Sequence, residues 1–146
     1  KILSIVPEAC IGVDVIVGFP GESEENFAET YKLLDTLNIS YLHVFSYSQR
    51  EHTDAINISP KVASQIIFDR SKKLNYLSLQ KKQNFYKKNL GSIREVLFEN
   101  WEGGILSGHS DNYIPIFING SEDDINKIFR VELVSLEDSK VMGQKV

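Results

Sequence analysis

The sequence is poor in the features that mark several classes of protein. Its one cysteine, Cys10, excludes an intramolecular disulfide and any metal or iron–sulfur site built from several thiolates. We interpret Cys10 as a small residue that precedes a strand. No run approaches the roughly 20 apolar residues that cross a bilayer, and no basic-then-apolar signal peptide is visible. These absences favour a cytoplasmic protein without a membrane partner.

The composition is that of a globular protein. The 146 residues are 42% hydrophobic and 25% charged, which is enough for one ordinary domain or two small ones. The first residue is Lys rather than Met, so we expect a piece of a longer protein.

Positive charge is concentrated in one segment. Residues 59–89 contain eight basic residues and one acidic residue, a net charge of +7 in a chain whose total is −4. A basic helix between acidic flanks indicates a face that meets a polyanion, although a solvated outer helix face is an equally good interpretation.

The first 90 residues alternate strands with helices. We expect strands at 12–19 and 41–47, a helix capped by Ser23 that stops near Asn38, and a helix that starts at Ser59-Pro60 and reaches residue 90, with a break near Asn75 or Asn84. This alternation predicts parallel strands. Two strands cannot bury both faces of a sheet, so the segment is predicted to be a slice of a larger α/β barrel or sheet.

Residues 91–146 have a different pattern. Short alternating runs at 94–99, 105–106, 113–118, 129–134 and 141–146 predict a small all-β barrel, with the second run ended by Ser107-Gly108. We therefore predict two domains, 1–90 and 91–146, with the boundary at Leu90–Gly91. The fold class is α/β followed by all-β.

One motif lies where ligands bind in parallel α/β folds. The residues Gly18, Phe19, Pro20, Gly21 and Glu22 follow a predicted strand at its carboxyl end. The glycines permit unusual backbone dihedrals, and exposed main-chain amides there could hold a ribose or an adenine edge. A plain strand-to-helix turn is the structural alternative.

Three ordered blocks resemble the radical-SAM tRNA methylthiotransferases, the MiaB-like family. Residues 14–27, Asp-Val-Ile-Val-Gly-Phe-Pro-Gly-Glu-Ser-Glu-Glu-Asn-Phe, and 43–50, His-Val-Phe-Ser-Tyr-Ser-Gln-Arg, are similar to its last barrel strands. Segments 96–99, 108–113 and 141–143 resemble its C-terminal TRAM domain. The branch acting on threonylcarbamoyladenosine is favoured, and the isopentenyladenosine branch is second.

The resemblance implies a C-terminal fragment: the end of a partial (β/α) radical-SAM barrel plus a TRAM barrel. The whole enzyme would add a methylthio group to an adenosine next to the anticodon of tRNA, using S-adenosylmethionine and two [4Fe–4S] clusters. The Cys-x3-Cys-x2-Cys ligands of the radical cluster are missing here. We therefore expect no catalytic residue, no metal and no bound cofactor in this chain alone. Residues 51–53, Glu-His-Thr, depart from the usual Pro-Gly-Thr type of loop.

The resemblance also assigns site residues. Those that would border S-adenosylmethionine are Gly18, Phe19, Pro20, Gly21, Glu22, Val44, Phe45, Ser46 and Arg50. For Val44 and Phe45 barrel core is the alternative, and Arg50 could simply pair with Glu51.

Candidates for contact with the anticodon stem-loop are Lys72, Lys73, Lys81, Lys82, Arg94, His109, Asn112 and Tyr113. Residues 91–146 contain five basic and ten acidic residues, a poor balance for binding phosphates, so we expect stacking and local contacts there.

Two non-catalytic interpretations remain open at this point. The chain could be a stand-alone RNA-binding module, or an adaptor whose half-barrel docks on a partner. As a fragment, it is also expected to self-associate through an open barrel edge.

Overall fold

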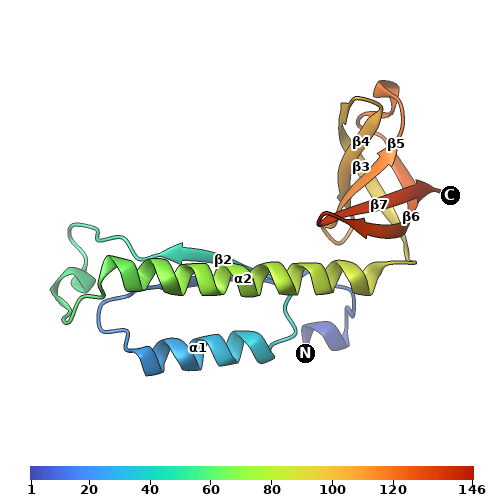
Figure 1. Ribbon diagram of the computed structural model, residues 1–146. Helices are drawn as coiled ribbons and strands as arrows, with labels where there is room; N and C mark the ends of the chain where they lie inside the picture. The colour runs from blue at the N-terminus through green and yellow to red at the C-terminus, as the bar shows by residue number, and fades with distance from the viewer. The chain divides into compact units, whose positions relative to one another are not determined.

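The computed structural model describes all 146 residues, and the chain divides into two compact units (Figure 1). Residues 11–82 form the α/β unit, and residues 1–10 and 83–146 form the barrel unit. The boundary between Lys82 and Gln83 lies inside helix α2 (Ser64–Asn89). The boundary expected from sequence, at Leu90–Gly91, instead follows the end of that helix.

The α/β unit is built on two parallel strands, as the alternating pattern predicts. β1 (Gly12–Val17) pairs with β2 (Tyr41–Ser46) in a register that runs from Gly12↔Tyr41 to Val17↔Ser46. The strands are joined by α1 (Glu24–Thr36). The predicted Ser23 cap is present, and Asn26 completes a capping box because its side chain accepts from the Ser23 amide.

Helices cover only one face of this sheet. The buried side chains of the unit are Val17, Phe27, Leu34, Leu42, Leu74 and Leu77. On the opposite face, the register partners Ile16 and Phe45 are 57% and 52% exposed. An open apolar sheet face is what a slice of a larger α/β structure would leave.

Helix α2 differs from the sequence-based expectation in its first residue and in its continuity. It begins at Ser64 rather than at Pro60, whose carbonyl instead accepts a hydrogen bond from the Gly21 amide (2.8 Å). It has no break near Asn75 or Asn84. Its buried Leu74 and Leu77 and the Ser78 hydroxyl, which bonds the backbone of Leu42, hold the middle of the helix on the sheet.

The barrel unit contains a closed five-stranded barrel in the order β3-β4-β5-β7-β6. The strands are β3 (Ile93–Glu102), β4 (Ile105–Ser110), β5 (Pro115–Asn119), β6 (Ile128–Glu137) and β7 (Lys140–Lys145). Alternate residues of each strand point inward, so Val96 and Phe98 of β3 are fully buried, as their spacing predicts.

Both of the strands predicted at 105–106 and 113–118 are present, but one bound of each is wrong. β4 continues through Ser107-Gly108 rather than ending there, because both residues pair with β3 and with β5. Glycine is required at 108 because β3 comes so close that a Cβ there would strike the Leu97 carbonyl. β5 begins at Pro115, and Tyr113 lies in the preceding turn.

No helix of the chain combines the length and the apolar composition that crossing a membrane requires.

Candidate functional site

A cavity of about 440 Å³ lies at the carboxyl ends of β1 and β2 in the α/β unit. Its lining residues are Ile16, Phe19, Phe45, Ser46, Tyr47, Ser48, Arg50, Thr53 and Ala55. The aromatic rings of Phe19 and Tyr47 meet edge to face with their centroids 5.3 Å apart. The cavity therefore has apolar walls, with hydroxyl and guanidinium groups among its lining.

The loop from Gly18 to Glu22 shapes one side of this region. Gly18 and Gly21 have φ angles of 78° and 85°, which confirms the expectation of unusual dihedrals. The amides of Gly18, Gly21 and Glu22 donate to Glu22 Oε2, the Pro60 carbonyl and the Phe19 carbonyl, respectively. These three amides are thus used within the unit, and the expectation that they are open to a ligand is wrong.

A buried arginine on α2 forms hydrogen bonds to Glu22 of this loop. Arg70 on α2 is 4% exposed, and its Nη1 lies 2.6 Å from Glu22 Oε2 and 3.1 Å from the Glu22 carbonyl. Its Nη2 contacts Glu24 Oε2 at 3.1 Å. Burial opposes the charge of Arg70, but hydrogen bonds to the carboxylates of Glu24 and Glu22 outweigh it and raise the pKa of the guanidinium. We name this Arg70–Glu22–Gly18 chain of contacts the loop clamp.

The structure separates the predicted cofactor residues into two groups. Phe19, Phe45, Ser46 and Arg50 line the cavity. Gly18, Pro20, Gly21 and Glu22 belong to the loop beside it, and Val44 packs toward the helices.

Sequence reasoning missed several residues of the cavity. Ile16 shares the open sheet face with Phe45, and the two-residue period of the strand could have placed it there. The Tyr47 hydroxyl is buried without a hydrogen-bond partner, and only the folded chain reveals this.

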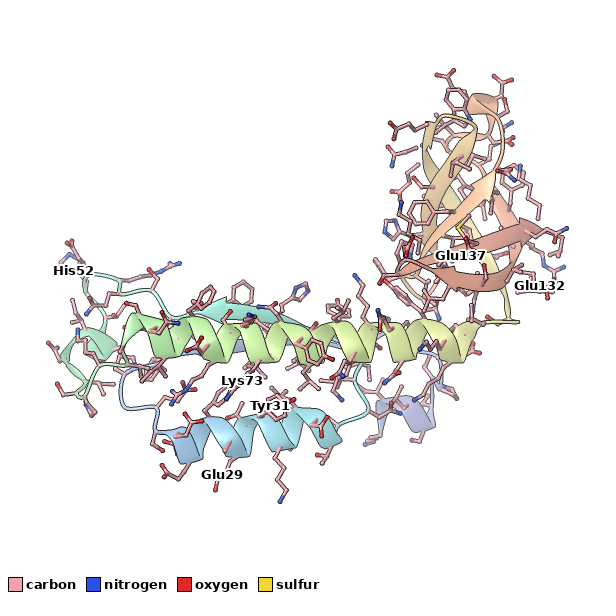
Figure 2. The ribbon with its side chains drawn as sticks, in the orientation of Figure 1. Glu29, Tyr31, His52, Lys73, Glu132 and Glu137 are labelled. Carbon is pink, nitrogen blue, oxygen red and sulfur yellow. The ribbon has the colours of Figure 1, made fainter.

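The four predicted lysines of α2 have different surroundings. Lys81 Nζ donates to the carbonyls of Asp35 and Leu37 (3.0 and 2.8 Å) at the end of α1. Lys73 and Tyr31 line a cavity of about 440 Å³ between α2 and α1 and point toward one another (Figure 2). Lys72 and Lys82 are exposed, and the helical period puts them about 80° apart, on the side of α2 away from Leu74 and Leu77.

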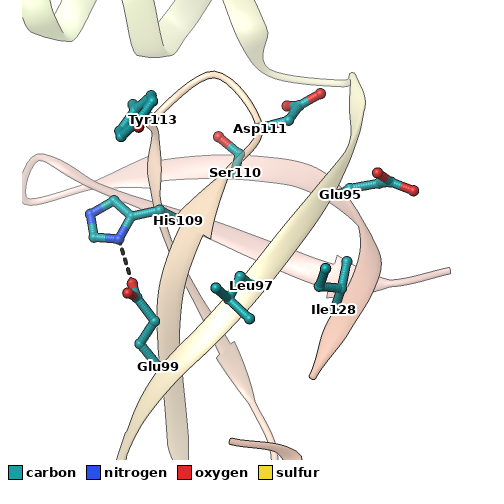
Figure 3. Close-up of a pocket in the computed structure, with 8 residues that line it drawn as sticks. All are labelled: Glu95, Leu97, Glu99, His109, Ser110, Asp111, Tyr113 and Ile128. Atoms are coloured by element: carbon teal, nitrogen blue, oxygen red, sulfur yellow. Dashed lines mark hydrogen bonds and ion pairs between the residues drawn. The ribbon is translucent and has the colours of Figure 1, made fainter. Parts of the chain in front are cut away.

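A larger cavity, about 620 Å³, lies on the surface of the barrel unit (Figure 3). We call it the barrel cavity; it is lined by Glu95, Leu97, Glu99, His109, Ser110, Asp111, Tyr113 and Ile128. His109 Nδ1 lies 2.7 Å from Glu99 Oε2, which fixes the orientation of the imidazole. Tyr113 is 77% exposed. Two of the predicted RNA-contact residues, His109 and Tyr113, therefore line one cavity.

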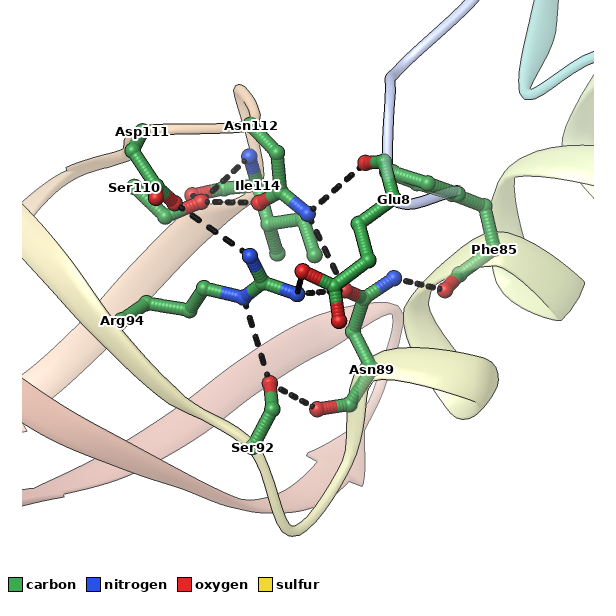
Figure 4. Close-up of polar contacts among 9 residues, drawn as sticks. All are labelled: Glu8, Phe85, Asn89, Ser92, Arg94, Ser110, Asp111, Asn112 and Ile114. Carbon is green, nitrogen blue, oxygen red and sulfur yellow. Dashed lines mark hydrogen bonds and ion pairs between the residues drawn. The ribbon is translucent and has the colours of Figure 1, made fainter. Parts of the chain in front are cut away.

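The other two predicted residues of this unit are buried beside it (Figure 4). Arg94 and Asn112 are each 8% exposed, and both donate to Asn89 Oδ1 at 3.0 Å. Arg94 also forms an ion pair with Glu8 (2.7 Å), and Asn112 bonds the Glu8 carbonyl. Their polar groups are engaged within the unit, so they fix the turn that carries Tyr113.

No cluster of three or more His, Cys, Asp or Glu side chains is arranged to hold a metal ion.

Comparison with known proteins finds clear relatives, although no family model matches the chain. Threonylcarbamoyladenosine tRNA methylthiotransferase MtaB of Aquifex aeolicus is 43% identical over 126 residues, covering 86% of this chain and 29% of that protein. The MtaB of Rickettsia prowazekii is 37% identical over 94% of this chain and 31% of its own length. A tRNA-2-methylthio-N(6)-dimethylallyladenosine synthase of Sulfurovum sp. is 34% identical over 98% of this chain and 33% of its own length. The chain spans about a third of the length of these curated relatives.

Proposed function

Because this chain belongs to the tRNA methylthiotransferases of the MtaB and MiaB type, we propose that it is the C-terminal part of an enzyme that adds a methylthio group to an adenosine next to the anticodon. In this proposal the α/β unit is the end of a partial (β/α) radical-SAM barrel, and the barrel unit is a TRAM domain. Threonylcarbamoyladenosine in cytoplasmic tRNA is the favoured target. The similarity over nearly the whole chain is the observation that supports this assignment.

The α/β unit would border S-adenosylmethionine, which supplies the radical chemistry of the family. The cavity at the ends of β1 and β2 fits this role, because Ile16, Phe19 and Phe45 offer apolar surface for an adenine ring. Ser46 and Arg50 offer a hydroxyl and a cation beside that surface. The loop clamp would position the loop next to the cofactor rather than contact it.

Iron–sulfur clusters do not fit the residues of this chain. A [4Fe–4S] cluster needs several cysteine ligands, and Cys10 is the single cysteine. The clusters used by the family would therefore be held by parts of the protein outside these residues, and the 146-residue chain alone would be inactive.

RNA contact would involve two surfaces with different chemistry. Lys72 and Lys82 on α2 offer positive charge to phosphates. Tyr113 and His109 in the barrel unit offer rings for stacking. Arg94 and Asn112 would support the Tyr113 turn, and Lys73 and Lys81 would support the packing of α1 on α2.

The cofactor assignment is tested in the full-length enzyme. Replacement of Phe45 by Ala should weaken S-adenosylmethionine binding about tenfold, since the contact of an adenine ring with an aromatic side chain contributes at least about 1.4 kcal/mol. Leu33→Ala, on the outer side of α1, is the matched control. Equal affinity for Phe45→Ala and the control, measured by calorimetry, would contradict the assignment.

The RNA assignment is tested with the 146-residue chain and an anticodon stem-loop. Affinity should fall with salt, and Lys72→Glu with Lys82→Glu should lower the slope of log K against log salt by roughly 1 to 2. Lys32→Glu on α1 is the control for a charge reversal elsewhere. Binding that ignores both salt and the two α2 reversals would reject a role for this helix.

A further inference from the structure

Tyr113 occupies a strained position that holds its ring in solvent. Its backbone φ of 62° is unfavourable for a residue other than glycine, and its side chain is 77% exposed. The turn is fixed around it, because the Tyr113 amide donates to the Ser110 carbonyl (2.9 Å) and the Ile114 amide to Ser110 Oγ (2.9 Å). Strain of this kind persists where the surroundings determine it, and it gathers at ligand sites.

The barrel cavity next to this ring combines an apolar floor with acceptor groups. Leu97 and Ile128, register partners on β3 and β6, are 40% and 64% exposed. In Figure 3 Ile128 lies below Glu95, on the same side as Asp111, and Leu97 lies between this side and the pair of His109 and Glu99. No lysine or arginine lines the cavity, and the nearby arginine ion pair joins Asp111 to the buried Arg94 (3.8 Å), so the lining itself offers a phosphate no lysine or arginine cation.

We propose that the barrel cavity binds one unpaired nucleobase that carries an exocyclic amino group. This inference rests on the proposed binding of RNA and names the chemistry that the barrel unit reads. The base lies over Leu97 and against the Tyr113 ring, which accounts for the exposed apolar and aromatic surface. Its amino group donates to the carboxylate of Glu95 or Asp111, as the cytosine amino group donates to Glu and Asp in base recognition.

The carboxylates of the barrel cavity then select between nucleobases and do not strengthen the binding of RNA phosphates. A base enters with its amino edge forward, while its phosphates stay outside the reach of the carboxylates. Uracil presents a carbonyl oxygen where cytosine presents its amino group, so the same carboxylates repel it. The His109–Glu99 pair closes the other side of the cavity as a second fixed ring.

The test compares oligocytidylate and oligouridylate of equal length, since these carry the same phosphate charge. With the 146-residue chain, we expect oligocytidylate to bind about tenfold more tightly and to shift the amide NMR signals of Leu97, His109 and Tyr113. Tyr113→Ala should weaken binding of oligocytidylate. Glu95→Gln combined with Asp111→Asn should reduce the cytidylate preference to about one, whereas Glu132→Gln, a carboxylate of β6 outside the cavity (Figure 2), should keep it.

Several results would overturn the proposal. Equal binding of the two oligonucleotides, or a preference that survives the Glu95 and Asp111 changes in a variant whose circular dichroism is unaltered, would reject base selection. If spermidine or an arginine peptide shifts these amides and both oligonucleotides leave them unchanged, the cavity takes a basic partner instead. Stem-loop binding that depends on Lys72 and Lys82 without any cytidylate preference rejects this inference alone, while no RNA binding at all rejects the RNA contact as well.

Discussion

The loop clamp gives a sharp test of how the candidate cofactor region is held. Replacing Arg70 by Met keeps the length of the side chain but leaves the Glu22 carboxylate, whose side chain is 13% exposed, with a hydrogen bond from the Gly18 amide. Removing one member of a buried ion pair costs about 3–5 kcal/mol, because the other charge stays buried. We expect the lower end of this range, about 3 kcal/mol, since Glu22 retains that amide contact.

The matched control lies in the same cluster. Glu24 contacts Arg70 at 3.1 Å but is 65% exposed, so Glu24→Gln should cost at most about 1 kcal/mol. The double variant Arg70→Met with Glu22→Gln should be less destabilised than the sum of the single changes, because it removes both charges together.

Urea denaturation with two probes makes the assay specific. Far-ultraviolet circular dichroism follows the helices, α1 and most of α2, which lie in the α/β unit, and Trp101 fluorescence follows the barrel unit. Arg70→Met should lower the midpoint of the first probe and leave the second unchanged. A loss below about 1 kcal/mol, or a loss as large for Glu24→Gln, would refute the clamp.

Three further predictions concern packing, titration and association. Gly108→Ala should destabilise the barrel by about 3 kcal/mol or more, since its Cβ would strike the β3 backbone, whereas Gly103→Ala, in open space, should cost about 1 kcal/mol in thermal melts. Burial, with a smaller contribution from the negative charge of the Cys10 thiolate, raises the pKa of Tyr86 to about 12, so stability should fall as the pH rises from 10 to 12. A Tyr86→Phe variant that keeps the same alkaline slope would contradict this. Phe45→Lys on the open sheet face should reduce self-association in sedimentation velocity, and Leu33→Lys should not; equal effects would reject association through that face.

Local signals in the sequence were sufficient for much of the architecture. The β-branched run before Gly18 and the alternation of Val96 and Phe98 identified strands, and Ser23 identified a helix start. Each of these signals lies within a few residues of the feature it predicts. The starting point of α2 was missed because Pro60 is bonded to Gly21, a contact that spans much of the unit.

In the candidate sites, too, motifs were recognisable from the sequence and long-range contacts were not. The motif from Gly18 to Glu22 and the aromatic residue Phe45 were recognisable as sequence, and so was the likeness to tRNA methylthiotransferases that the relatives confirm. The hydrogen bonds from Lys81 to the end of α1 could not be recognised from the sequence. Nothing in a lysine's neighbours along the chain reveals which carbonyls it will contact.

The sequence by itself therefore determined the family, the order of strands and helices, the uneven charge and the missing cluster ligands, since composition, periodicity and motif spacing are properties of the chain alone. Only the tertiary structure decided which predicted residues are accessible. Arg94 and Asn112 became part of a buried network with Glu8, while His109 and Tyr113 came to line a cavity with Glu95 and Ile128. Burial and partner choice depend on residues that are distant in sequence, and the fold brings those residues together.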